Sequence, residues 1–389
     1  MMDSFDYVVI GAGIAGLSAA AALARHGRVA VIEAEQAIGY HSSGRSATFS
    51  HFGIGNLTVR GLTAYSRSFF ERPPEGFSEA PLSRRAPALF VATEAMLAAL
   101  DRLHEDMSRF SSELTEVDEA GMKALFPPVR TGPGAILRGV ADRSGLRLDA
   151  DALLQAYARA LRSAGGSLRL GRRVEAIERS NRSWCVRSGA ESWSAPVLID
   201  AAGAWADQVA RLAGVMPLGL APMRRTIIMI DPPEGADLRG WAFLKTAVDD
   251  FYVLPEAGKL IASPVDEIPT DPCDAWPEEY DIALAAAKVE HYTCLSVRRI
   301  AHSWAGLRSF VADRVPTAGF APDAPGFFWL IGQGGFGLQT APAMAEIVEA
   351  LVTGGRWPEG LTELGVTADK IRPERLAVKP IESPPVPQP

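Results

Sequence analysis

Three glycines near the N-terminus have the spacing of a phosphate-binding turn. Gly11, Gly13 and Gly16 follow the order G-x-G-x-x-G, and Glu33 stands where a ribose-binding acid is expected. Gly11 can make a tight turn, Gly13 lets the backbone approach a pyrophosphate, and Gly16 lets a helix lie close to a strand. A carboxylate at Glu33 can accept hydrogen bonds from ribose hydroxyls. The pattern indicates a dinucleotide site, and a merely structural glycine turn is the alternative.

The residues around these glycines must position them. Residues 7–10 form a short apolar run rich in β-branched side chains, which predicts a buried strand. Residues 17–26 are rich in alanine and predict a closely packed helix, and residues 29–32 predict a second strand that ends at Glu33. Together they predict a βαβ unit in which the N–H groups and the positive dipole end of the helix face the phosphates.

Three other segments could border the same ligand. Residues 34–47 form a polar loop whose hydroxyls and arginine could donate to a phosphate or a ring edge, although a solvated surface loop is the alternative. The strand predicted at 195–201 ends in small residues that allow close approach of a backbone. The strand predicted at 327–332 leads through the glycine-rich residues 333–337 to a helix at 341–351, which repeats the arrangement at the N-terminus.

Composition and charge exclude several classes of protein. The chain of 389 residues has a net charge of -7 and no cluster of Lys and Arg, which argues against a nucleic-acid partner. The apolar start has no basic segment before it, so a signal peptide is not expected, and no run is long enough for a membrane span. The three cysteines have no metal-binding spacing, so we predict no metal site and a cytoplasmic protein with reduced thiols.

Residues 63–126 and 224–302 predict a second domain inserted into the first, because they lack the βαβ rhythm. The helices predicted there are 63–70, 93–107, 116–126 and 281–291, and the strands are 89–91, 226–230, 251–254 and 260–262. Outside these two stretches we predict a helix at 146–164, with Asp149 as N-cap, and short strands at 167–170, 174–179 and 183–187.

On four longer motifs the chain resembles the D-amino-acid oxidase-like family of FAD-dependent oxidoreductases. These motifs are GYHSSGRSA at 39–47, IDAAGAWAD at 199–207, WAGLRSF at 304–310 and GQGGFGLQTAPA at 332–343. With the N-terminal glycines they extend the resemblance from residue 7 to about 364. Within the family, the chain is most similar to the bacterial D-arginine dehydrogenase type.

The resemblance implies an α/β fold in which a Rossmann-like FAD-binding domain is interleaved with an antiparallel β-sheet substrate domain that carries helices. The FAD domain would comprise 1–50, 145–223 and 303–370, and the substrate domain 51–144 and 224–302. Residues 371–389 would form a proline-rich tail, extended or disordered. The implied FAD contacts are Gly11, Gly13, Ile14, Ala15, Gly16, Glu33, Ala34, His41, Ser42, Ser43, Arg45, Ser46, Ala47, Val174, Ala202, Gly203, Trp205, Gly306, Gly334, Gly335, Gly337, Leu338 and Gln339.

The resemblance also implies a reaction and the residues that support it. FAD would accept a hydride at N5 from the α-carbon of an amino acid, and the imino acid would hydrolyse to a 2-oxo acid and ammonia. Arg308 falls where an arginine binds the substrate carboxylate in a bidentate fork, assisted by Tyr252 and Arg225. The carbonyl of Gly335 would face the amine. On the residues alone, Arg308 could equally sit in a buried ion pair and Tyr252 could be a half-buried strand residue.

Departures from the D-arginine dehydrogenase pattern change the expected substrate. Phe49, Ile54 and Ala88 stand where that type has a histidine, a tyrosine and a glutamate. Without a carboxylate at position 88, a cationic side chain has no counter-ion. An apolar pocket follows, suited to neutral or hydrophobic D-amino acids or to an imino acid such as D-proline, and His51 could add a polar contact.

Several alternatives remain open at this level. Some relatives attach flavin covalently through a histidine or cysteine near His41, but closer relatives with the same loop do not, so we predict non-covalent FAD. The substrate could instead be a secondary amine or N-methyl amino acid, or a 2-hydroxy acid. The chain could also be a flavin subunit that passes electrons within a complex, or an NAD-binding dehydrogenase. The electron acceptor could be O₂ or a quinone.

Overall fold

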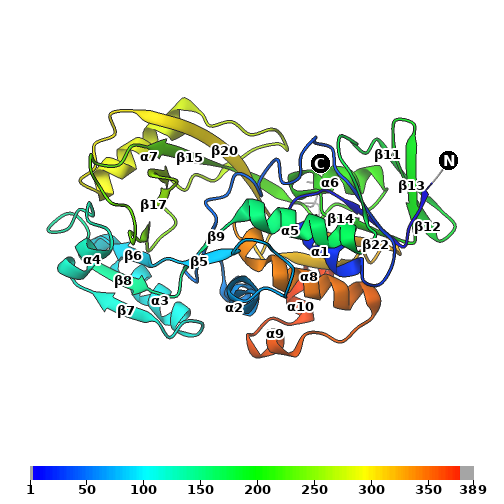
Figure 1. Cartoon of the computed structure of the whole chain (residues 1–389), viewed down its shortest axis with the longest axis horizontal. Helices are drawn as coiled ribbons and strands as arrows, with labels where there is room; N and C mark the ends of the chain where they lie inside the picture. The colour runs from blue at the N-terminus through cyan, green and yellow to red at the C-terminus, as the bar shows by residue number, and fades with distance from the viewer. Residues whose placement is uncertain (1–2, 377–389) are drawn as a thin grey trace, which may run out of the picture.

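Two large sheets organise residues 3–376, the part of the chain that the computed structural model describes (Figure 1). The first has six strands in the order β10-β3-β2-β14-β22-β21, of which all but β21 run parallel. Their bounds are Ser167–Arg169 (β10), Val29–Ile32 (β3), Tyr7–Ile10 (β2), Val197–Asp200 (β14), Phe327–Ile331 (β22) and Thr317–Phe320 (β21). The predicted parallel core of the dinucleotide unit is therefore present.

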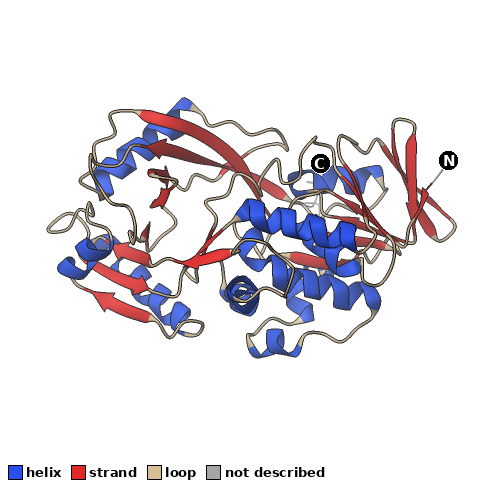
Figure 2. Ribbon diagram, in the orientation of Figure 1, coloured by secondary structure: helices blue, strands red, loops and turns tan. Residues whose placement is uncertain are grey.

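The six-stranded sheet is the middle of three layers (Figure 2). One face packs on helices α1 (Ile14–Leu23), α5 (Ala150–Ser163) and α8 (Gly337–Thr353). The other face packs on α6 (Ala206–Leu212) and on a four-stranded sheet of β1 (Asp3–Ser4), β13 (Glu191–Ala195), β12 (Ser183–Ser188) and β11 (Ala176–Ser180). Buried on both faces, the central strands are mainly apolar, as parallel strands usually are, with the buried Asp200 at the end of β14 as an exception. The small side chains of α1 let it lie between α5 and α8.

The second large sheet has nine strands in the order β19-β15-β18-β17-β16-β6-β8-β7, with β20 also paired to β15. Its pairs are antiparallel except β16 with β6. The strands are β6 (Ala88–Ala92), β7 (Leu114–Val117), β8 (Arg138–Asp142), β15 (Ala221–Ile230), β16 (Phe243–Thr246), β17 (Tyr252–Glu256), β18 (Lys259–Ser263), β19 (Ile268–Pro269) and β20 (Ile300–Phe310). Helices α3 (Leu97–Ser108), α4 (Glu119–Leu125) and α7 (Glu279–Tyr292), with the short turn η1 (Glu94–Met96), accompany it.

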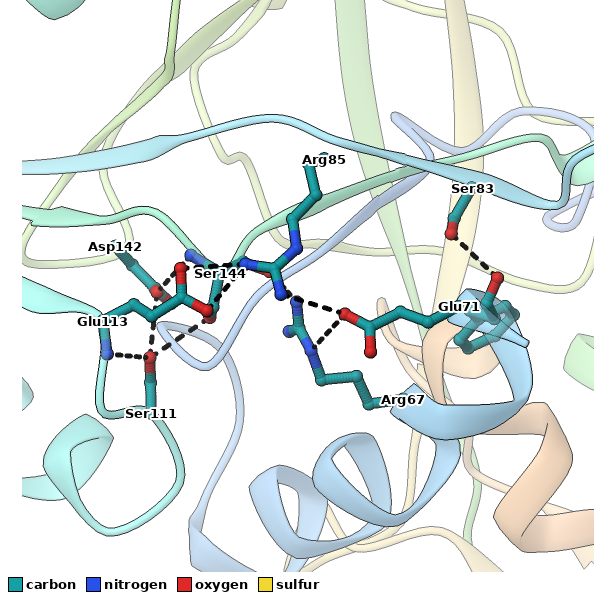
Figure 3. A network of polar contacts seen from close by, with 9 residues as sticks. Arg67, Glu71, Ser83, Arg85, Ser111, Glu113, Asp142 and Ser144 are labelled. Carbon is teal, nitrogen blue, oxygen red and sulfur yellow. Dashed lines mark hydrogen bonds and ion pairs between the residues drawn. The ribbon is translucent and has the colours of Figure 1, made fainter.

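Continuous strands and a shared polar network join the two halves. β15 and β20 pair along their whole length and run through the domain boundaries predicted at 223/224 and 302/303. A small sheet of β4 (Phe49–Ser50), β9 (Leu146–Leu148) and β5 (Ser83–Arg85) lies between the halves. Arg85 pairs with Glu113 at 2.6 Å and with Glu71 at 3.4 Å. These contacts link β5 to α2 (Leu57–Glu71) and to the segment before β7 (Figure 3).

Local chemistry explains where the predicted elements were right or wrong. Asp149 caps α5 as predicted, since Ala152 N–H donates to its Oδ1 at 2.9 Å, but residues 146–148 form strand β9 instead of a first helical turn. The helix predicted at 116–126 was wrong at its start. Asp118 accepts a hydrogen bond from Gly121 N–H at 2.8 Å and begins α4, while residues 114–117 form β7. Strands β13 and β16 were not predicted.

The C-terminal part is more ordered than the sequence suggested. Helices α9 (Glu359–Glu363) and α10 (Ala368–Ile371) lead to the turn η3 (Pro373–Leu376). Ile371 is fully buried and Arg375 pairs with Asp313 at 2.8 Å, so residues 371–376 belong to the folded body and not to an extended tail. The rest of the predicted tail, 377–389, lies outside the described residues. No helix in residues 3–376 has both the length and the apolar character needed to span a membrane.

Candidate active site

A groove follows the carboxyl ends of the parallel strands β3, β2, β14 and β22. It consists of two adjoining pockets that share Gly13, Ser42, Ser43, Ala201 and Gly203. The first pocket extends past Glu33, and the second extends to the start of α8. The ends of parallel strands are where α/β sheets bind their ligands. The groove therefore places the predicted dinucleotide site at the edge where the fold expects it.

The glycines of the first turn are required by close contacts. Gly11 has a φ of +103°, and a Cβ there would lie 2.5 Å from the carbonyl oxygen of Ala201. A Cβ at Gly16 would lie 1.9 Å from the carbonyl oxygen of Gly11, so α1 can approach the turn only without a side chain at that position. A Cβ at Gly13 would meet only Ser43 Oγ at 3.4 Å, and this position is open to the groove.

Glu33 is held in place inside the first pocket. Its Oε2 accepts from Ala12 N–H at 2.6 Å and its Oε1 from Glu35 N–H at 2.8 Å. Each carboxylate oxygen keeps a further lone pair, so Glu33 can still accept from a ligand hydroxyl. His41 bonds Glu35 at 3.0 Å and packs on Trp205 with ring centroids 4.5 Å apart. Ala34, Val174 and Ala202 complete the predicted residues that line this pocket.

The second pocket lies between the starts of two helices. Ile14 and Ala15 of α1 face Gly334, Gly335, Gly337 and Leu338 at the start of α8 across it, and Ser46 also borders it. Gln333 lines the same pocket, and among the described residues its buried Nε2 has no hydrogen-bond partner. Donors and helix N-termini that converge in this way favour an electron-rich ligand.

A third, smaller cavity opens beside the second pocket and shares Ser46, Arg308 and Gly335 with it. The predicted catalytic residues Arg308, Tyr252, Arg225 and Gly335 all line this cavity, with Ala47, Phe49, His51 and Ile54. Its volume is about 60 Å³. One water needs roughly 10–15 Å³ of such space, so the cavity holds about four to six waters and suits a compact molecule.

Arg308 is a buried cation without an anionic hydrogen-bond partner. Its side chain lies on β20, only 6% of the residue is exposed, and its one hydrogen bond goes to the carbonyl of Leu307 at 3.4 Å. Burial and the neighbouring charge of Arg225 lower the pKa of Arg308 from 12.5 to about 10. The predicted alternative, a buried ion pair, is not formed among the described residues.

The other cation predicted for the site is already neutralised. Arg225 Nη2 pairs with Glu267 at 2.9 Å and its Nε donates to the carbonyl of Asp266 at 3.0 Å. Its neighbour Arg224 points to the opposite face of the strand, where it binds Asp281 at 2.9 Å, because successive residues of a strand alternate between faces. Tyr252 is buried beside Arg225 and Arg308, and burial raises the pKa of its phenol, so its hydroxyl stays protonated and can donate.

Aromatic rings form much of the cavity wall. Phe49 stacks on Phe243 with ring centroids 4.8 Å apart, and His51 and Tyr252 lie 5.0 and 5.5 Å from the same ring. His51 Nδ1 accepts from Gly53 N–H at 3.1 Å. Burial, followed by the charge of Lys245, lowers the pKa of His51 to about 3, so this imidazole is neutral with its proton on Nε2.

Several predicted site residues lie outside the three cavities. Arg45 holds its loop against two distant segments, because it donates to the carbonyls of Ala275 at 3.0 Å and Ala305 at 3.2 Å and pairs with Asp274. Gln339 is buried, accepting from His51 N–H and donating to Thr63 at 2.8 Å.

Ala88 and Gly306 were also predicted for the site, but they lie behind the residues that line the cavities. Ala88 pairs with Phe243 across β6 and β16, and the larger phenyl ring lines the cavity in its place, so the prediction for Ala88 was wrong. Gly306 makes room for its neighbours, because a Cβ there would lie 3.1 Å from Arg308 Nη1.

Five residues that line the cavity were not predicted from the sequence. Three are polar, Thr48, Lys245 on β16 and Asp249 in the following turn, and two are apolar, Phe243 and Val265. In the first pocket, Arg172 and Arg173 were also not predicted, although this basic pair lies just after a predicted strand. The side chain of Lys245 gave no such signal, because a lysine within a short apolar run is ordinarily solvent-facing.

The chain matches known proteins over most of its length. Residues 6–351 match the family model described as FAD dependent oxidoreductase. Human peroxisomal sarcosine oxidase is 30% identical over 227 residues, covering 56% of this chain and 55% of that protein, so the aligned region spans about half of this relative.

Solved structures share the fold at low sequence identity. L-α-glycerophosphate oxidase from Mycoplasma pneumoniae, solved with FAD bound, superposes with a TM-score of 0.81 at 19% identity over 90% of this chain and 95% of that one. Glycine oxidase from Geobacillus kaustophilus superposes with a TM-score of 0.80 at 19% identity over 91% and 96%. The predicted closeness to D-arginine dehydrogenase is not among these likenesses and stays a prediction.

Proposed function

The chain belongs to this family of FAD-dependent oxidoreductases, and we propose that it oxidises the carbon–nitrogen bond of an α-amino acid. The observation that carries the proposal is Arg308, a buried guanidinium that has no anionic hydrogen-bond partner within residues 3–376, in a cavity that adjoins the end of the cofactor groove. A substrate carboxylate would supply the missing counter-ion in a bidentate pair. Within this class we propose a D-α-amino acid with a non-basic side chain.

FAD is the cofactor, and the residues of the groove fit it. Glu33 keeps free lone pairs for the ribose, the open position at Gly13 borders both pockets at the start of α1, and the unpartnered Gln333 Nε2 offers a donor at the far end. Bound FAD supplies the two-electron oxidation by accepting a hydride from the carbon that carries the amine. Because the second pocket shares Arg308 and Gly335 with the small cavity, a substrate held there borders the groove directly.

Each residue of the cavity has a defined part in this proposal. Arg308 binds and orients the carboxylate, and the protonated hydroxyl of Tyr252 donates to one of its oxygens. The carbonyl of Gly335 accepts from the substrate amine and turns the α-carbon toward the groove. Arg225, already paired with Glu267, adds positive potential without competing for the carboxylate. The amine must arrive neutral or lose its proton to solvent, since no carboxylate side chain other than Asp249 lines the cavity.

We propose that the flavin is not covalently attached. His41 lies in the first pocket, bonded to Glu35 and packed on Trp205 next to the predicted ribose acid. The reacting end of FAD would lie in the second pocket, which Arg308 lines, and His41 is not among the residues that line that pocket. Denaturing the holoenzyme and filtering it should release all of the yellow colour, and colour retained on the protein would contradict this.

Size and charge support a compact, non-basic substrate. The cavity holds about four to six waters, or about 120–180 Å³ of liquid water, which is small for an arginine-like side chain. Its acidic group, Asp249, is 64% exposed and already paired with Lys245 at 2.7 Å, so a cationic side chain finds no buried counter-ion. The D configuration rests on the resemblance of the WAGLRSF and QGGFG motifs to D-amino-acid dehydrogenases.

An N-methyl amino acid is the second candidate substrate, and the aromatic wall favours it. Phe49, Phe243 and Tyr252 surround part of a small cavity, and aromatic faces attract a methylated or cationic nitrogen. The identity with peroxisomal sarcosine oxidase points in the same direction.

One experiment separates these substrates. The purified holoenzyme is mixed without oxygen with D- and L-alanine, D-proline, sarcosine, D-arginine and D-lactate, and bleaching of the flavin band is followed. Fast bleaching by D-alanine or D-proline alone supports the proposal, and fast bleaching by sarcosine supports the second candidate. If D-lactate bleached the flavin but no amine did, amino-acid oxidation would be wrong. Readmitting air or a quinone then identifies the acceptor.

A further inference from the structure

Lys245 is a buried cation in the substrate cavity for which the proposed reaction has no use. It lies on β16 and only 4% of the residue is exposed. It pairs directly with Tyr252 across β16 and β17, so the two side chains stand on the same face of the sheet and both line the cavity. Burying a lysine costs free energy unless its charge is met, so its place in a small cavity calls for a reason.

The ammonium group of Lys245 is only partly satisfied. It pairs with Asp249 Oδ1 at 2.7 Å and makes a long contact of 3.4 Å with the carbonyl of Thr246, whereas an ammonium has three donors. The two partners differ sharply in exposure, because 5% of the lysine side chain but 64% of the aspartate side chain is exposed. The lysine is therefore the more buried member of the pair, and the aspartate is the more exposed one, in the turn after β16.

His51 supplies a second donor from a neighbouring segment. Its Nδ1 accepts from Gly53 N–H at 3.1 Å, which places the ring proton on Nε2. Among the described residues, no acceptor is bonded to that Nε2–H, although His51 lines the cavity together with Lys245. The charge of Lys245 also helps to keep His51 neutral, so the ring serves as a fixed donor instead of a second cation.

We propose that Lys245 and His51 form a second anion subsite, separate from Arg308 and Tyr252, and that the substrate is an amino acid whose side chain carries a carboxylate. The inference rests on the proposed function and deepens it, because Arg308 would take the α-carboxylate and Lys245 the distal one. A compact dicarboxylic amino acid, such as aspartate or glutamate, fits the space for four to six waters. The expected apolar pocket is then apolar only along Phe49 and Ile54.

The difference in burial between Lys245 and Asp249 favours an acidic substrate over a basic one. A buried donor with an unmet hydrogen bond gains more from an incoming charge than a solvated carboxylate does, because water already satisfies the latter. Asp249 would orient the ammonium in the free protein and would weakly repel an incoming carboxylate. Lys245 and Asp249 therefore have opposite effects on an acidic substrate, which makes them matched test positions.

The test compares each acid with its amide, which has nearly the same shape. A general loss of activity in a variant lowers both values of kcat/KM and leaves their ratio unchanged. For the holoenzyme, the kcat/KM for anaerobic flavin reduction is measured with D-glutamate, D-glutamine, D-aspartate, D-asparagine, D-alanine and D-lysine. We expect each acid to exceed its amide by about 10-fold or more. In Lys245→Met, the acid-to-amide ratio should fall by about 10-fold or more, to about 1 or below, because the charge that favours the acid is gone. In Asp249→Asn, the ratio should rise several-fold.

The outcomes separate this inference from the proposed function. If D-alanine and the amides reduce the flavin as well as the acids do, the subsite is wrong while amino-acid oxidation stands. If D-lysine is the best substrate and Asp249→Asn abolishes its advantage, the subsite binds cations and the proposal is overturned. If no amino acid reduces the flavin, both the anion subsite and the proposed amino-acid oxidation are wrong. Should Lys245→Met not fold, the acid-to-amide ratios of the unaltered protein still decide the question.

Discussion

Replacing Arg308 by Met should remove most of the activity and yet stabilise the ligand-free protein. Burial and Arg225 lower the pKa of Arg308 from 12.5 to about 10. Since one pKa unit corresponds to about 1.36 kcal/mol, the folded protein carries a penalty of roughly 3 kcal/mol for keeping this charge. Met fills a similar volume without the charge, so the free energy of unfolding should increase by up to about 3 kcal/mol in urea titrations at pH 7.

The loss of activity follows from the same isolated charge. Removing one partner of a buried, hydrogen-bonded charge pair costs about 2–5 kcal/mol, which corresponds to about 30- to 5,000-fold in kcat/KM. Anaerobic stopped-flow reduction of the flavin measures this without interference from the acceptor. Arg308→Lys should fall between Met and the original residue, because lysine restores the charge but not the planar fork.

Arg224 on the paired strand β15, opposite Leu307, provides the matched control for Arg308. Its side chain lies on the other face of the sheet and pairs with Asp281 at 2.9 Å, where Asp281 is 3% exposed. Arg224→Met should therefore lower stability, because it leaves a buried carboxylate without its partner, and should leave kcat/KM nearly unchanged. If Arg308→Met kept full activity, or if it destabilised the protein as Arg224→Met does, the assignment of Arg308 to the substrate carboxylate would be refuted.

Three further changes test other parts of the structure. Tyr252→Phe should reduce kcat/KM for an amino acid by about 10- to 100-fold through loss of one hydrogen bond to a charged group, and an unchanged value in flavin-reduction assays would remove the hydroxyl from the site. His51→Gln should flatten the pH dependence of stability. The unfolded chain takes up a proton near pH 6.5 but folded His51 only near pH 3, so stability falls as the pH drops through this window, by about 2 kcal/mol at pH 5. Urea unfolding at pH 7 and pH 5 measures this change in the free energy of unfolding. If the change were the same in His51→Gln and in the unaltered protein, the neutral, buried ring would be contradicted. Asp207→Ala should cost about 2–4 kcal/mol in urea unfolding, because Asp207 accepts from the N–H groups of Leu218 at 3.2 Å and Leu220 at 2.9 Å, whereas a cost below 0.5 kcal/mol would show that water replaces it.

The sequence carried enough information for the cofactor half of the fold because its signals are local. A short β-branched strand, a glycine turn and an alanine-rich helix follow each other within thirty residues, and each step has its own physical requirement. The close contact between Gly16 and the carbonyl of Gly11 at α1 is one that spacing alone could anticipate. The same locality explains why Asp149 was identified as an N-cap, since a cap bonds to a residue only three positions away.

The parts of the site that were missed depend on strand register, which no local pattern contains. β16 is a four-residue strand that includes a lysine, and only its pairing with β17 places Lys245 opposite Tyr252 and inside the cavity. Arg45 was predicted to reach a phosphate, but its donors face carbonyl oxygens at Ala275 and Ala305, far away in sequence. Ala88 was assigned to the pocket by resemblance, and its pairing with Phe243 puts the larger ring there.

The register of two strand pairs also explains why three cationic side chains line one cavity. On β15 and β20, Arg225 pairs with Gly306, and Arg308 stands two residues further on the same face, so both guanidinium groups reach one cavity. On β16 and β17, the pairing of Lys245 with Tyr252 brings a third cation to it. Glu267 pairs with the first and Asp249 with the third, whereas Arg308 has no anionic hydrogen-bond partner among the described residues. Shifting either pairing by one residue would turn these side chains to the opposite face, so the proposed preference for a carboxylate depends on the same hydrogen bonds that hold the sheet together.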